Sequence, residues 1–90
     1  MTRFAIFKAP DRQTYALEIE GHTYVPVLAC VYESGTDDPQ AVANRLLSTG
    51  IYGFWTEGEC SDDWEWLDLE DVDHEKWNRF LQLSCEVLNT

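Results

Sequence analysis

The sequence predicts an α+β fold: a small antiparallel sheet with two helices packed on one face, in the element order β-β-β-α-β-β-α. Two observations support this prediction. Several short segments alternate between apolar and polar residues, as strands with one buried face do, and two other segments carry apolar residues at helical spacing. A hydrophobic fraction of 44% supplies a core. Residues 1–90 are expected to form a single compact domain, because 90 residues is a usual size for one.

The first two predicted strands are residues 3–8 and 14–20. The second strand alternates regularly, so one set of its side chains is expected to face the core. That set is Tyr15, Leu17 and Ile19, and the opposite set is Ala16, Glu18 and Glu20.

Gly21-His22 fits a two-residue hairpin turn with glycine at the first central position. In that register Glu20 pairs with Thr23, and Ile19 pairs with Tyr24. The third strand then places a further set of residues on the core face. These residues are Tyr24, Leu28, Cys30 and Tyr32.

The first helix is predicted from Pro39 to about Ser48. Asp38 is the expected N-cap, proline suits the first helical position, and Gly50 follows the last turn as a C-terminal glycine does. The helix is short, so its stability is expected to depend on packing of its apolar side. That side consists of Val42, Ala43, Leu46 and Leu47.

Residues 51–56 and 64–69 are predicted to form a second hairpin, joined by an acidic loop over 57–63. Gly53 is expected at a bulge or at a close approach of the backbone to another group. Alternation places Trp64 and Trp66 on one face of the second strand and Glu65 and Leu67 on the other, and either face could be the interior.

The last helix has the clearest start signal. Asp73 is the expected N-cap, and Val72 and Trp77 occupy the two positions of a hydrophobic staple. Its apolar stripe is Trp77, Phe80, Leu81, Ser84, Cys85 and Leu88. We expect one core shared by Tyr15, Leu17, Ile19, Leu28, Trp77, Phe80, Leu81 and Leu88.

The formal net charge is −11, from 17 acidic and 6 basic residues. Direct binding to nucleic acid or to an anionic membrane requires a basic face, so the sequence predicts neither. No apolar run reaches the roughly 20 residues of a membrane span or the length of a secretory signal. The three cysteines are widely spaced and form no Cys-x-x-Cys motif, so they are expected to be reduced thiols. We therefore expect a cytoplasmic protein.

Residues 57–75 hold ten acids and no lysine or arginine. Apolar residues interrupt this run, so the acids are expected on a folded surface rather than in a disordered tail. The predicted contact residues for a partner are Glu57, Glu59, Asp62, Asp63, Trp64, Glu65, Asp68, Glu70, Asp71 and Asp73.

No catalytic or metal-binding pattern accompanies these acids. Histidines and cysteines lack zinc-ligand spacing, and residues 71–75 resemble a calcium loop only at its opening, without the glycine that such a loop needs. Cys60 lies between Glu59 and Asp62, whose charges disfavour a reactive thiolate. The sequence therefore predicts a protein that is not an enzyme and has no cofactor or metal.

A Lys/Arg-rich protein that handles nucleic acid is the expected partner, because clustered carboxylates match a site built for phosphate. In size, acidity and lack of catalytic motifs the chain resembles small phage-encoded anti-defence proteins, such as anti-CRISPR proteins and other DNA mimics. The resemblance implies an inhibitor. An antitoxin or immunity protein against a basic nuclease toxin, and a non-catalytic adaptor domain, are the alternatives.

Overall fold

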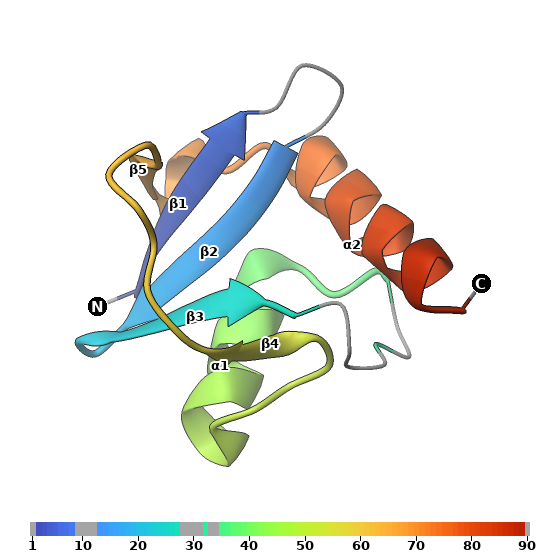
Figure 1. Cartoon of the computed structure of the whole chain (residues 1–90), viewed down its shortest axis with the longest axis horizontal. Coiled ribbons are helices and arrows are strands. Elements are labelled where there is room, and N and C mark those ends of the chain that lie inside the picture. The colour runs from blue at the N-terminus through green and yellow to red at the C-terminus, as the bar shows by residue number, and fades with distance from the viewer. Residues whose placement is uncertain (1, 9–12, 28–31, 33–34, 90) are drawn as a thin grey trace.

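In the computed structural model the chain is described over residues 2–8, 13–27, 32 and 35–89, with 85–89 as backbone only (Figure 1). These residues form a five-stranded antiparallel sheet and two α-helices, which confirms the predicted α+β fold. The strands are β1 (Thr2–Lys8), β2 (Gln13–Ile19), β3 (His22–Pro26), β4 (Trp55–Glu57) and β5 (Glu65–Asp68). The helices are α1 (Pro39–Thr49), the short 3-10 helix η1 (Leu69–Asp71) and α2 (His74–Asn89).

The strand order is β4-β3-β2-β1-β5, so the two late strands occupy opposite edges of the sheet. Their registers define one row of residues across all five strands: Glu57, Tyr24, Leu17, Phe4 and Leu67. Every neighbouring pair is antiparallel, so β4 and β5 run in the same direction. The predicted second hairpin is therefore wrong. Residues 58–64 form a crossover that must span four strand spacings, about 19 Å.

The start of β4 also differs from the prediction. A turn through Gly53, with φ +61°, brings the Trp55 amide to the Tyr52 carbonyl at 3.0 Å, and the paired strand begins only at Trp55. The expected close approach at Gly53 is confirmed, because a side chain there would collide with the ring of Tyr32.

The hairpin between β2 and β3 turns one residue earlier than predicted. Glu20 and Gly21 are its central residues, with φ of +51° and +86°, as a type I′ turn requires. Ile19 therefore pairs with His22, and Leu17 pairs with Tyr24. The shift leaves Tyr24 on the predicted face, because the partner changes by two positions and the alternation of faces is retained.

Side-chain caps fix the helix starts as predicted. The Asp38 carboxylate accepts from the Ala41 amide at 2.7 Å, and Asp73 accepts from the amides of Glu75 and Lys76 at 3.0 and 3.2 Å. Gly50 ends α1 in the left-handed conformation. Leu47 was wrongly assigned to the buried side: it is 49% exposed, because the helix packs through Val42, Ala43 and Leu46 and position 47 lies beside that stripe.

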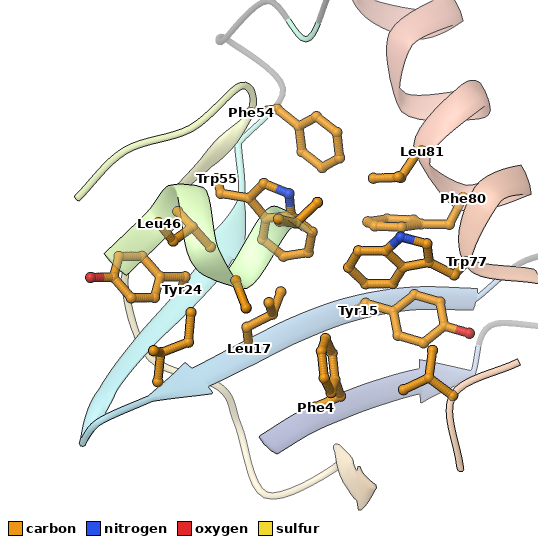
Figure 2. Packing of buried hydrophobic residues seen from close by; sticks show 14 of the residues in the cluster. Phe4, Tyr15, Leu17, Tyr24, Leu46, Phe54, Trp55, Trp77, Phe80 and Leu81 are labelled. Atoms are coloured by element: carbon orange, nitrogen blue, oxygen red, sulfur yellow. The ribbon is translucent and has the colours of Figure 1, made fainter. Parts of the chain in front are cut away.

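Both helices cover one face of the sheet, called the inner face below, and the core lies between them (Figure 2). Trp55 from β4 and Trp77 from α2 stack in its centre, with ring centroids 5.9 Å apart and planes 13° apart. The core residues that the sequence predicted and that belong to this cluster are Tyr15, Leu17, Ile19, Trp77, Phe80 and Leu81. The positions of Leu28 and Cys30 and the side chains of Cys85 and Leu88 lie outside the described part of the chain.

Candidate interaction surface

The crossover from β4 to β5 passes over the outer face of the sheet, the face opposite the helices (Figure 1). Near β3, the Gly58 amide donates to the Thr23 carbonyl at 2.9 Å. Near β2, Cys60 lies close enough to Glu18 for that charge to act on its thiol. Near β1, the Trp64 ring lies 5.5 Å from the Phe7 ring. The loop thus contacts β3 at its start and β1 at its end, and it passes over the face between them (Figure 1).

Two alanines lie in the middle of the outer face. Ala5 and Ala16 pair across β1 and β2, and neither is exposed to solvent. Ala16 has the predicted orientation, away from the helices, yet it is buried. Trp66 of β5 pairs with Ala5, and the crossover passes over the same face of the sheet (Figure 1). Small side chains at these positions let the loop lie close to the sheet.

All ten acids of residues 57–75 are exposed, and we call them the acidic band. Glu57 lies at the β4 edge, Glu59, Asp62 and Asp63 lie in the crossover, and Glu65 and Asp68 lie on β5. Glu70 and Asp71 follow in η1, and Asp73 and Glu75 lie at the start of α2. Asp68 shares the outer face with Trp66, and the crossover that carries Glu59, Asp62 and Asp63 passes over that face. Glu57 and Glu65 pair with core residues of the neighbouring strands, so they lie toward the helix side at opposite edges of the sheet. The band therefore follows the crossover and the two sheet edges and continues toward the start of α2.

Few cations neutralise the acidic band. Lys8 lies 3.5 Å from Glu65, and the His22 Nδ1 atom lies 3.2 Å from a Glu57 oxygen. Within the described ranges, no other acid of the band has an ion pair. Asp73 differs from the rest because it caps α2, so its carboxylate already has a structural role.

Three aromatic side chains share the outer face beside the band: Phe7, Trp64 and Trp66, which we call the aromatic patch. Phe7 and Trp66 are each 39% exposed, and Trp64 is half-buried against Phe7. Only Trp64 was among the predicted contact residues. The alternation of residues in β1 indicates that Phe7 lies on the outer face, because it is out of phase with the core residues Phe4 and Ile6 and shares a face with Arg3.

Arg3 of β1 links Trp66 of the aromatic patch to Glu18 of β2. Its guanidinium lies over the Trp66 ring, 4.4 Å from the ring centroid, and its Nη2 atom lies 2.8 Å from a Glu18 oxygen. An indole face and a carboxylate thus hold one guanidinium between them.

The most acidic point of the crossover is attached to the aromatic patch. The Trp64 amide donates to the Ser61 carbonyl at 3.4 Å, closing a turn with Asp62 and Asp63 at its tip. Because the Trp64 ring packs on Phe7, it anchors this turn to β1. Two exposed carboxylates are consequently held next to exposed aromatic surface.

Cys60 is a half-buried free thiol in the crossover. Burial raises its pKa, and the charge of Glu18 raises it further. The expected direction is confirmed, but the charged neighbour is Glu18 from β2 rather than Glu59 or Asp62. Over the described residues, no group of three or more histidine, cysteine or acidic side chains is arranged to hold a metal ion.

No protein-family model, curated protein or solved structure matches this chain. In the described part of the chain, neither helix has the length and apolar character required to cross a bilayer.

Proposed function

We propose that this protein is a small, non-catalytic inhibitor that occupies the basic nucleic-acid-binding site of a partner protein in the cytoplasm. In this proposal the acidic band takes the place of nucleic-acid phosphates, as in phage anti-defence proteins that mimic DNA. One observation carries it: ten exposed acids are held on folded backbone, and among the described residues only the Lys8 ammonium and the His22 imidazole lie within ion-pair distance of them.

The electrostatics of the acidic band favour a role in binding a partner over a role in solubility alone. Like charges held close together repel and lower the stability of a fold, so a dense band with so few basic neighbours is unfavourable unless a partner binds it. Duplex DNA carries about one charge per 1.7 Å of its axis, and a site built for it presents lysine and arginine side chains at comparable density. Opposite electrostatic potentials on two proteins also accelerate their association, and this acceleration falls steeply as the salt concentration rises.

The partner is identified by capture and then by competition. The protein is immobilised, exposed to a nuclease-treated bacterial lysate and eluted with a salt gradient. We expect a basic protein to elute at moderate salt, and duplex DNA to displace it at low salt because both ligands use one site. A captured protein that binds duplex DNA and this chain simultaneously would contradict the proposal.

Charge reversal tests which acids are used. Asp62→Lys/Asp63→Lys is expected to weaken binding at least tenfold, mainly through slower association, while far-UV circular dichroism is unchanged. The control Glu20→Lys/Asn44→Lys/Ser48→Lys alters the net charge by the same amount at exposed positions outside the band. If both variants bind equally well, net charge alone attracts the partner and the acids only solvate the surface.

A further inference from the structure

We infer that the aromatic patch is a docking site for arginine side chains of the partner's basic surface. This inference rests on the proposed function and adds to it the position of closest contact and the kind of cation preferred. Phe7 and Trp64, together with the part of Trp66 that Arg3 leaves exposed, would receive guanidinium groups, and the adjoining Asp62-Asp63 turn would pair with them.

The exposure of the patch is the first argument. Most aromatic side chains of this chain are buried on the inner face, but Phe7 and Trp66 each leave 39% of their surface in solvent. Exposed aromatic residues on strands, supported by a packed neighbour such as Trp64, are typical of protein interfaces and their energetic centres.

Arg3 supplies the second argument, because it occupies a site of the proposed kind within the chain. Its guanidinium lies over the Trp66 ring at 4.4 Å and pairs with Glu18 at 2.8 Å. The other side of the patch offers a similar combination without an internal cation: Phe7 and Trp64 lie next to Asp62 and Asp63, and neither acid has an ion pair among the described residues.

Charge complementarity selects the occupant. A second copy of this chain would bring another net charge of −11 against the band, and nucleic acid would bring phosphates, so both are repelled. A guanidinium is planar, stacks on aromatic rings and pairs with carboxylates through a fork of N–H groups, whereas an ammonium is more strongly hydrated. The patch and turn together therefore favour arginine over lysine.

The test uses two probes, an oligo-arginine and an oligo-lysine peptide of equal length, titrated into the protein by calorimetry at low salt. We expect the arginine peptide to bind about two- to fivefold more tightly through its aromatic contacts. In the ¹⁵N spectrum of the unsubstituted protein, the indole N–H signals of Trp64 and Trp66 should shift. Those of the buried Trp55 and Trp77 serve as internal controls and should not shift.

Substitution separates the aromatic contribution from simple charge attraction. Phe7→Thr/Trp66→Thr should bring the arginine-to-lysine ratio toward one. The control Leu47→Gln/Ile51→Thr removes exposed apolar surface elsewhere, at positions 49% and 61% exposed, and should leave the ratio unchanged. The indole shifts provide an independent readout if the patch variant folds poorly.

The outcomes distinguish the two proposals. Arginine selectivity that depends on the patch, together with selective indole shifts, supports the docking site. Equal binding of the two peptides, or indole signals that do not move, overturns it. In that case the acidic-band function still stands if Asp62→Lys/Asp63→Lys abolishes peptide binding and the matched charge control does not. If neither peptide binds at low salt, both proposals are wrong.

Discussion

The two faces of the sheet use aromatic residues in opposite ways. On the inner face, Trp55 and Trp77 are fully buried between the sheet and the helices and stack on each other. On the outer face, Trp64 and Trp66 rest on the sheet beneath no helix and retain contact with solvent. The inner face is closed by regular structure and the outer one by a seven-position loop, residues 58–64. Tryptophan content alone therefore does not reveal which face is the core.

The polar contacts on the two faces differ as well. On the helix side, the Asp37 carboxylate accepts from the hydroxyls of Tyr32 and Tyr52, and the Trp77 indole donates to the Asp37 carbonyl at 2.8 Å. These bonds join two loops to α2. On the outer face the polar groups are charged, and Arg3 is the residue that links aromatic and acidic side chains there. One side is thus organised for stability, and the other leaves charge and aromatic surface accessible.

The largest expected effect comes from removing one tryptophan from each face. Trp77→Ala should lower the free energy of unfolding by about 3–5 kcal/mol, because it empties the centre of the core. Trp66→Ala should lower it by about 1 kcal/mol, since part of that ring is already in water. Urea denaturation of both variants measures the difference. Equal losses would show that the two faces contribute equally to stability.

A middle-sized effect is expected at Ala16, which is fully buried on the outer face. Ala16→Leu adds volume where the loop lies against the sheet and should destabilise the protein by about 1–3 kcal/mol. Thr14→Leu, on the same face of β2 but only half-buried, is the matched control and should be nearly neutral. The crossover should also become more sensitive to protease in the Ala16 variant. An unchanged denaturation midpoint for Ala16→Leu would mean that the loop does not cover this position.

The smallest expected effect is a loss of folding stability at alkaline pH, caused by buried tyrosines of the inner face. Burial raises the pKa of Tyr32 and of Tyr15, and the neighbouring charges of Asp37 and Asp73 respectively raise them further. The folded state therefore favours the neutral phenols. This stabilisation is complete below the ordinary tyrosine pKa of about 10 and is lost as pH rises beyond it. Tyrosinate absorbance should lag behind that of free tyrosine until the protein unfolds.

Tyr32→Phe sharpens this test. The variant loses the hydrogen bond to Asp37, so it should be less stable at neutral pH by about 1 kcal/mol. Above pH ~10 its stability should decline less steeply than that of the parent, because one ionisable buried group is gone. An equal slope in the two proteins would contradict the role given to Tyr32.

Features that depend on neighbouring residues could be predicted from the sequence. The caps at Asp38 and Asp73 and the glycine after α1 each follow from groups within one helical turn. The hairpin register was harder to predict, because Gly21 suits the first position of one turn type and the second position of another. Both alternatives keep the same face buried, so the apolar pattern did not distinguish them.

Partner choice between distant strands could not be predicted locally. Alternation in 64–69 indicates a strand with two different faces, but it contains no information on whether β4 or β1 is the neighbour. Phe4 pairs with Leu67, far away in the sequence. The exposure of the acids followed from their charge, whereas their arrangement along the crossover and the two sheet edges and the involvement of Phe7 depend on the path of the crossover. The sequence therefore indicated which acids are exposed, but it did not indicate where they lie relative to the strands.

The strand order also has a consequence for the path of folding. β1, β2 and β3 are joined by short connections, so their pairing requires little loop closure and is expected to form early. The β1–β5 pair closes a segment of about two thirds of the chain, from Ile6 to Glu65, and it brings the acids together as it does so. We therefore expect β5 to dock late, faster in added salt, and until then β1 remains an unpaired edge open to association with other chains.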